Sequence, residues 1–352
     1  MIKVQVPLRV SLAGGGGDFP EIFENISCNI VSSTIDKFVE LQIVERSDNK
    51  ILIQDNSLGS ETLTITSIPK LVPTANEIIL NSIYQFRNDL KNGFSLLIKN
   101  DVTPGSGLGA SSAICIGLTI IMSRLTKKNT TTHEILTKSF QNERVLSKIP
   151  GGIQDFFPAL FGPNIYLNIE KGNINLKKFE KNLQFDKLIK GIIIIKKEKQ
   201  TNRLNELRNQ IEKFQSKKDF FAPLYLELSR YGENLYESIL SENFEKICLN
   251  IKGATEIKRK ISPEYKLTPR ITKLLSSGKV WAHKTVGAGL GGHYLLYAIN
   301  SNTEEIKKIL LQEKLQFFVP KLGESRIVIS EQSNEEVIVN DECKFPTVDF
   351  YR

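Results

Sequence analysis

The sequence lacks several features that mark common protein classes. Its 352 residues include only four cysteines, and these show neither a CxxC pair nor the Cys/His spacing of a metal site. It has no run of 18 or more apolar residues, and its first residues lack the apolar core of a signal peptide. We therefore expect a cytoplasmic protein with reduced thiols and no membrane partner.

The charge does not single out a nucleic-acid partner either. The net charge is +8, but the lysines are scattered and interleaved with Glu and Asn, as in KKFEKNLQFDKLIK at 177–190. Because the lysines form no basic face, we expect no nucleic-acid partner. Polyanionic small molecules such as nucleotides and sugar phosphates fit the positive charge equally well. Hydrophobic residues at 40% and charged residues at 24% are ordinary for a globular protein.

The length predicts two domains, because single cores usually split before they reach this size. Alternating apolar residues over Lys3–Ala13 and Ile30–Val44 indicate a β-rich beginning. We place the boundary ahead of the apolar run GIIII at 191–195, after which most of the sequence is helical in pattern. The predicted domains are residues 1–186 and 187–352.

The middle and the end of the chain predict further elements. Glu134–Ser147 has helical spacing and should end before the next proline, whereas Phe156–Leu167 is predicted to be extended. The chain then ends with strands over Val280–Val286 and Tyr294–Ile299, a helix, and a strand over Arg326–Ser330. This order is compatible with a split βαβ, ferredoxin-like layer and gives an α+β fold class.

A glycine-rich segment, PGSGLGASS at 104–112, carries the most information. Glycines let backbone N–H groups approach an anion, and the apolar helix that follows presents its positive N-terminus to the same point. The segment has no Lys, as a Walker loop requires, and its third Gly is one position early for a dinucleotide fingerprint. We expect these residues to hold the phosphates of a nucleotide, with a simple turn before a core helix as the alternative: Pro104, Gly105, Ser106, Gly107, Leu108, Gly109, Ala110, Ser111 and Ser112.

Two more glycine-rich segments accompany this one. RVSLAGGGGD at 9–18 follows a strand and ends in a carboxylate, and GAGLGG at 287–292 lies between two apolar strands. Each alone fits a flexible turn or a hairpin. Three such segments in one chain are poorly explained by turns.

Together these segments resemble the motifs of the GHMP kinases, which include galactokinase, homoserine kinase, mevalonate kinase and phosphomevalonate kinase. RVSLAGGGGD resembles the first motif, PGSGLGASSA the second and KTVGAGLGG the third, in the family's order and at its usual separations. The resemblance implies transfer of a phosphoryl group from ATP, with Mg²⁺, to a hydroxyl. It also implies an N-terminal domain of the ribosomal S5-like type and a C-terminal ferredoxin-like domain.

Longer segments resemble the bacterial heptose-phosphate kinases, which act on D-glycero-D-manno-heptose 7-phosphate. They are LRVSLAGGGGDFPEIF, SSTIDKFVELQIV, IPGGIQDFFPALFG and QTNRL. Galactokinases carry a Glu-His pair where this chain has Gly15 and Gly16, which disfavours galactose. The subgroup usually has Thr at Gly17 and Gln at Phe156. The implied reaction is phosphorylation of the anomeric C1 hydroxyl of a heptose 7-phosphate by a monomer or homodimer; another sugar such as fucose, or a non-catalytic sensor of this fold, is the alternative.

The resemblance also implies roles for residues. Asp155, in PGGIQD, matches the active-site Asp that accepts or orients the hydroxyl proton, and Arg9 matches the basic residue beside it. Ser111 and Glu143 match the Mg²⁺ ligands, with Ser112 as the fallback. The alternatives are ordinary structural roles: a turn cap for Asp155, an exposed strand-edge residue for Arg9 and a helix-face residue for Glu143.

A wider set is implied to bind the sugar phosphate. Asp18 would accept hydrogen bonds from sugar hydroxyls. Lys37 and Arg203 are candidate partners of the phosphate group that the sugar already carries. The set comprises Gly14, Gly15, Gly16, Gly17, Asp18, Asp36, Lys37, Gly152, Gln154, Arg203, Gly289 and Gly291.

Overall fold

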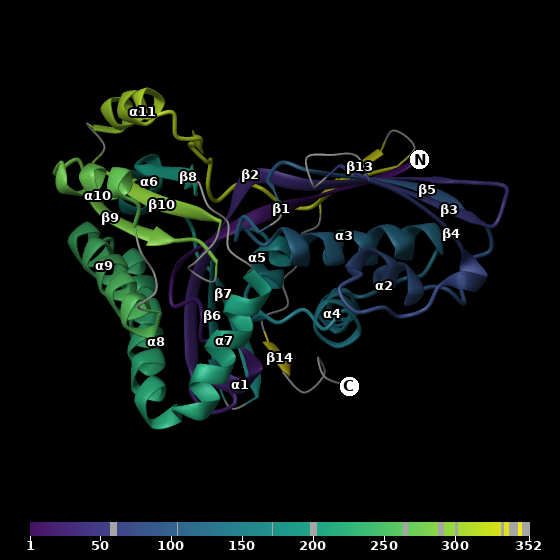
Figure 1. The fold of residues 1–352 in the computed structure, drawn as a ribbon, viewed down its shortest axis with the longest axis horizontal. Helices are drawn as coiled ribbons and strands as arrows, with labels where there is room; N and C mark the ends of the chain where they lie inside the picture. The colour runs from purple at the N-terminus through teal and green to yellow at the C-terminus, as the bar shows by residue number, and fades with distance from the viewer. Residues whose placement is uncertain are drawn as a thin grey trace.

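The computed structural model of the chain is shown in Figure 1. It describes residues 1–56, 62–103, 105–170, 172–197, 203–262, 267–287, 292–299, 302–331, 334–337 and 344–346. Within them the chain forms a mixed 10-stranded sheet and an antiparallel 4-stranded sheet, each with helices against it. The α+β class is therefore confirmed. No helix among these residues is long and apolar enough to cross a membrane.

Two long strands organise the large sheet. β1 (Ile2–Ala13) runs antiparallel to β2 (Cys28–Glu45), which is 18 residues long. One end of β2 pairs with β5 (Phe94–Asn100) and the other with β6 (Ile165–Glu170), so β2 joins the two wings of the sheet. The remaining strands are β3 (Lys50–Asp55), β4 (Thr62–Ser67), β7 (Asn173–Lys178), β12 (Val328–Glu331), β13 (Asn334–Val337) and β14 (Lys344–Pro346).

Helix α3 (Ala110–Leu125) lies along β1 and β2 (Figure 1). It is buried on almost every side because the sheet covers one face and other helices cover the rest. Those other helices are α2 (Ile78–Tyr84), α4 (Thr132–Phe140) and α5 (Phe156–Phe161). The N-terminus of α3 is thereby held fixed beside β1.

The second half of the chain builds the small sheet, in the order β11-β8-β10-β9, and a layer of helices. Strand β8 contains the GIIII run, whose alternate isoleucines enter two different cores: Ile192 and Ile194 face the main core, and Ile193 and Ile195 a smaller one. The elements of the small sheet and its helical layer are α6 (Leu183–Lys190), β8 (Ile192–Lys196), α7 (Arg203–Ser216), α8 (Lys218–Leu240), α9 (Phe244–Ile261), α10 (Pro269–Ser276), β9 (Val280–Thr285), β10 (His293–Ala298), α11 (Thr303–Gln312) and β11 (Phe317–Phe318).

Two predictions are confirmed only in part: extended chain is present at Ile165–Leu167 in β6, and a strand at Val328–Ser330 in β12, but the rest is wrong. Phe156–Phe161 is the helix α5, short and buried along its whole length, so its sequence shows no helical period. The strand predicted at Arg326–Ser330 does not close the small sheet, because β12 pairs with β1 and Ile327 and Ile329 enter the main core. The short strand β11 takes that place instead.

The helical prediction for Glu134–Ser147 is confirmed with one addition. α4 is followed directly by a π-helical turn, Gln141–Leu146, which the spacing did not indicate. The division at residues 186 and 187 stays a prediction, although β12 and β14 lie beyond it and pair with strands of the large sheet.

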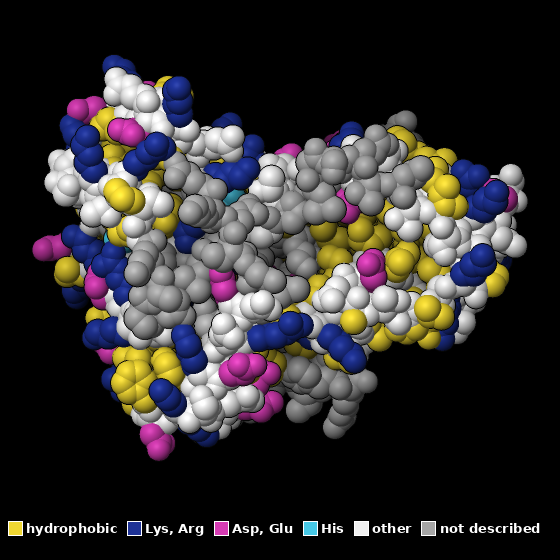
Figure 2. Space-filling model, in the orientation of Figure 1, with side chains coloured by type: hydrophobic (Ala, Val, Ile, Leu, Met, Phe, Trp, Pro, Cys, Tyr) yellow, Lys and Arg dark blue, Asp and Glu magenta, His cyan; other side chains and the backbone are white. Residues whose placement is uncertain are grey.

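Charged side chains are dispersed on the face shown in Figure 2. Lys and Arg side chains are interspersed with Asp and Glu side chains over both halves of the chain, rather than gathered in one block. The described residues of this face therefore present no single basic surface.

Candidate active site

The second glycine-rich segment forms a tight loop at the N-terminus of α3. Gly107 and Gly109 have φ of +79° and +82°, and Gly109 is the residue before the helix. A side chain at Gly107 would place its Cβ 2.6 Å from the Val286 carbonyl oxygen, so the loop also needs glycine to fit against the strand end at 286–287. Bare backbone thus faces the positive end of a long helix, as in an anion site.

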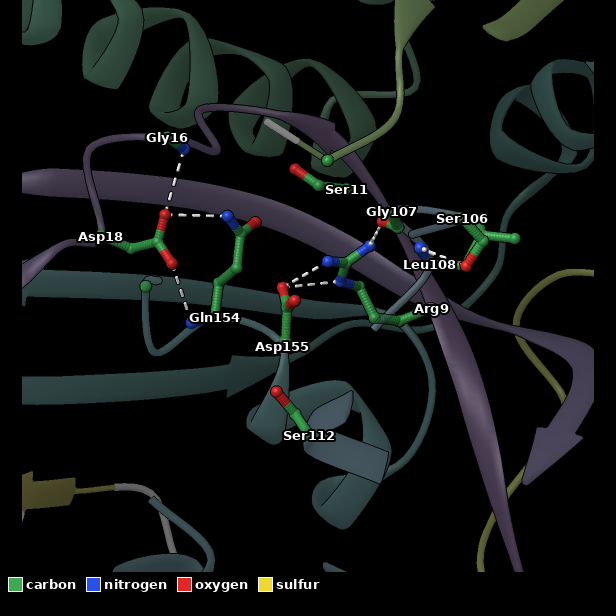
Figure 3. A network of polar contacts seen from close by, with 12 residues as sticks. Arg9, Ser11, Gly16, Asp18, Ser106, Gly107, Leu108, Ser112, Gln154 and Asp155 are labelled. Carbon is green, nitrogen blue, oxygen red and sulfur yellow. Dashed lines mark hydrogen bonds and ion pairs between the residues drawn. The ribbon is translucent and has the colours of Figure 1, made fainter. Parts of the chain in front are cut away.

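Strand β1 brings Arg9 to this loop. Its backbone N–H donates to the Leu108 carbonyl at 3.0 Å, and Nη1 donates to the Gly107 carbonyl at 2.7 Å. Nε donates to Asp155 Oδ1 at 2.9 Å, and Nη2 pairs with the same oxygen (Figure 3). The guanidinium is 3% exposed. Arg9 therefore joins the predicted phosphate loop to the predicted catalytic carboxylate, at the start of α5.

Asp18 is the second carboxylate of the site. It is 1% exposed and accepts hydrogen bonds from Gly16 N at 3.0 Å, Gln154 N at 3.0 Å and Gln154 Nε2 at 2.8 Å. Burial raises the pKa of Asp18, and the charge of Asp155 acts in the same direction, while the backbone donors oppose it. Figure 3 shows Asp18 and Asp155 on either side of Gln154. The carboxylate is thus held in one orientation.

Glu143 projects toward the start of α3 from the π-helical turn. Ser112 Oγ donates to its Oε2 at 2.9 Å, and Arg144 Nη2 lies 3.5 Å from the same oxygen. Ser111 is half-buried and lines the same cavity as Glu143. Ser111 and Glu143 therefore line the cavity beside the loop that would hold phosphates, and their hydroxyl and carboxylate oxygens are hard donors that fit Mg²⁺.

These groups meet in one cavity. Arg9, Asp18, Ser111, Glu143 and Asp155 all line a hollow of about 240 Å³. Its far wall comes from the second half of the chain, through helices α7 and α9.

Two lysines of this region were not predicted as site residues. Lys258 of α9 lines the cavity, and Lys284 of β9, 8% exposed, donates to the Ser11 carbonyl at 2.5 Å. Desolvation lowers the pKa of both side chains, that of Lys284 most strongly. One signal was available, because Lys258 continues the buried stripe of Ile251 and Ala254 at helical spacing.

Several predicted substrate residues lie elsewhere. Asp36 accepts a hydrogen bond from Lys321 N at 2.8 Å, and the Lys37 ammonium lies 5.5 Å from the centre of the Phe318 ring. Neither lines the 240 Å³ cavity. Arg203 begins α7. Pro104, Gly289 and Gly291 lie outside the described residues.

The first glycine-rich segment is close to the cavity. Gly16 lines it, and Gly14 and Gly15 line a smaller hollow of about 30 Å³ that also contains Gly16. At Gly17 a Cβ would lie 3.1 Å from Cys28 Sγ, so a side chain there would require the thiol to shift by a few tenths of an ångström.

A comparison with known families tests whether the glycine-rich segment 104–112 is a simple turn or a kinase motif. The family profile described as GHMP kinases N terminal domain matches residues 77–163, which include the phosphate loop, Glu143 and Asp155. The chain carries a GHMP kinase N-terminal domain. The recognition made from the three glycine-rich segments is therefore confirmed for this part of the chain.

Two curated kinases are similar to this chain in sequence. The D-glycero-alpha-D-manno-heptose 7-phosphate kinase of Campylobacter jejuni is 30% identical over 165 residues, which cover 46% of this chain and 48% of that protein. The mevalonate kinase of Methanocaldococcus jannaschii is 22% identical over 303 residues, 82% of this chain and 91% of that protein. The first match thus spans about half the length of the heptose kinase.

Solved GHMP kinases share the fold across most of the chain. A D-glycero-D-manno-heptose 1-phosphate kinase from Bacteroides thetaiotaomicron has a TM-score of 0.75 at 16% identity, covering 94% of this chain and 99% of that one. The galactokinase of Lactococcus lactis, solved with galactose, has a TM-score of 0.71 at 17% identity, covering 92% and 94%. At these identities the likeness establishes the GHMP kinase fold.

Proposed function

We propose that this chain is an ATP- and Mg²⁺-dependent sugar kinase that transfers the γ-phosphoryl group to the anomeric C1 hydroxyl of a heptose 7-phosphate. The observation that carries the proposal is the Arg9–Asp155 pair, which lies between the phosphate loop and the buried Asp18. The similarity to the Campylobacter heptose 7-phosphate kinase supports the choice of sugar.

Asp155 is the proposed acceptor of the hydroxyl proton. Phosphoryl transfer needs little covalent help, so the protein mainly positions the reactants and balances charge. Arg9 fixes the Asp155 carboxylate from one side through two nitrogens, and its remaining contact to the Gly107 carbonyl ties that carboxylate to the phosphate loop. A sugar hydroxyl beside Asp155 would thereby be aligned with the γ-phosphorus.

Ser111 and Glu143 are the proposed protein ligands of Mg²⁺, which usually takes one or two carboxylates and completes its shell with waters and substrate phosphates. When bound, the ion neutralises charge that develops on the phosphate oxygens. Ser112 donates to Glu143 Oε2 and orients that carboxylate, so its proposed role changes from fallback ligand to support of the ligand.

Asp18 is the proposed anchor of the sugar. Oδ1 already accepts two hydrogen bonds and Oδ2 accepts one, so Oδ2 keeps capacity for one more donor. Gly152 leaves the space in which the carboxylate lies, and Gln154 holds it through both its backbone and its side chain.

The test measures ADP release by the purified full-length chain with a panel of sugars. Heptose 7-phosphate should be turned over with the highest kcat/KM, ahead of mannose, fucose and galactose, and phosphorus NMR should place the new phosphate on C1. A charge-assisted contact to the phosphate already on the sugar accounts for a preference of about ten- to a hundredfold. Equal efficiency on a free sugar would reject the heptose phosphate, and ATP binding without ADP release on any sugar would favour a sensor.

A further inference from the structure

Lys258 occupies the junction between two of the glycine-rich segments. It projects from α9, and its side chain passes Gly16, where a Cβ would lie 3.2 Å from its Cε and 3.3 Å from its Nζ. Its Nζ donates to the Gly287 carbonyl at 3.4 Å. Gly287 in turn touches the phosphate loop, since a Cβ on it would lie 2.8 Å from the Gly107 Cα. The ammonium therefore lies between the sugar side and the phosphate side of the cavity.

Three cationic side chains line this cavity among the described residues: Arg9, Arg144 and Lys258. The first two each make several contacts inside the protein. Arg9 contacts Asp155 and a loop carbonyl, and Arg144 donates to two backbone carbonyls, of Ile149 at 2.9 Å and Gly152 at 2.6 Å.

Lys258 differs from both arginines. An ammonium has three N–H donors, and the one hydrogen bond of this ammonium within the described residues is long, at 3.4 Å. Burial lowers the pKa of Lys258, while the charges of Asp18 and Asp155 favour the ammonium form and that of Arg9 opposes it. Within the described residues it makes the fewest hydrogen bonds of the three cations, so its ammonium keeps donors for a ligand.

We propose that Lys258 is a catalytic residue that donates hydrogen bonds to the phosphoryl group during its transfer, an inference that rests on the proposed kinase function. A bond forms between the sugar hydroxyl oxygen and the γ-phosphorus of ATP, while the bond from that phosphorus to the β–γ bridging oxygen breaks. ADP leaves with the electron pair, and the hydroxyl proton passes to Asp155. Lys258 keeps its proton and stabilises the charge on the non-bridging oxygens.

The test compares Lys258→Met, Lys258→Arg and, as a control, Lys260→Met, which removes an exposed lysine from the same helix. Lys258→Met should lower kcat by about ten- to a hundredfold with little change in KM for either substrate. Lys258→Arg should recover part of the loss, and Lys260→Met should match the unmodified chain. The thermal unfolding midpoint of Lys258→Met should not fall, because the change removes a desolvated charge.

A second measurement uses the nucleotide alone. Calorimetry measures the affinity for MgADP in the absence and presence of aluminium fluoride. Bound next to MgADP, aluminium fluoride mimics the transferred phosphoryl group. The unmodified chain should bind MgADP more tightly with aluminium fluoride, and Lys258→Met should lose that gain while keeping its affinity for MgADP. An equal gain in the variant, or a raised KM for heptose 7-phosphate with unchanged kcat, would overturn this role. Absence of MgADP binding in the unmodified chain would instead overturn the proposed function, and this inference with it.

Discussion

Replacing Gly152 with alanine tests the geometry of the sugar side. A Cβ at this position would lie 1.7 Å from Asp18 Oδ2 and 2.2 Å from its Cγ. Since ordinary contacts begin near 3.4 Å, the carboxylate must move by more than about 1 Å. That movement breaks at least one of its hydrogen bonds to Gln154, at 3.0 Å and 2.8 Å.

The expected cost follows from those bonds. A hydrogen bond to a buried charged group contributes about 1.5 to 3 kcal/mol, so the loss of one or two should lower the free energy of unfolding by about 3 kcal/mol. Urea titration measures this change. In turnover assays KM for the sugar should rise while KM for ATP stays constant, because the added Cβ displaces Asp18, the proposed sugar anchor.

A double-mutant cycle supplies the control. In the Asp18→Ala background the carboxyl group is gone, so Gly152→Ala should cost less than about 1 kcal/mol. The coupling between the two sites should then reach about 2 kcal/mol. If Gly152→Ala costs as much without the Asp18 carboxyl as with it, the close approach is not the cause and the reasoning is wrong.

Three further predictions concern charge. Asp155→Asn should keep ATP binding by calorimetry but lower turnover at least about a hundredfold, and near-normal turnover would remove Asp155 from the proposed role. Glu143→Gln should raise the Mg²⁺ concentration for half-maximal rate without changing sugar KM; superimposable Mg²⁺ curves would make Glu143 structural. Burial and the charge of Arg259 lower the pKa of His283 from 6.5 to about 4 in the folded chain. As pH falls, the imidazole of His283 therefore takes up its proton at a higher pH in the unfolded chain than in the folded chain. Stability should therefore drop between pH 6.5 and 4, by up to about 3 kcal/mol relative to His283→Gln; parallel urea-unfolding profiles of the two proteins would contradict this.

The loops of the site were predictable because glycine marks places where no side chain fits. Gly107 and Gly109 have positive φ, and Gly107 also packs against Val286, just after β9. The local structure at these positions therefore requires glycine, and the sequence alone reveals it. Arg9 and Asp155 are 146 residues apart, and no local pattern relates them. Their pairing was expected only through the resemblance to a family.

The remainder could not be predicted because the deciding contacts are distant in sequence. α5 is buried throughout and therefore shows no helical period, and β12 is selected by a free edge of β1, more than 300 residues earlier. Lys258 lies next to Arg259 and Lys260, and the one signal that separates it from them is its helical spacing from the apolar Ile251 and Ala254. Only the fold places it in the cavity.

The π-helical turn at Gln141–Leu146 makes the site sensitive to chain length. A π turn holds one more residue than an α turn, and successive residues of an α-helix are rotated by about 100°. Deleting one residue here would let the α4 hydrogen-bond pattern continue and would turn Glu143 away from Ser112. Exposed side chains in this turn, such as Val145, can be varied, but the number of residues in the turn must stay constant if Glu143 is to keep its place in the proposed metal site.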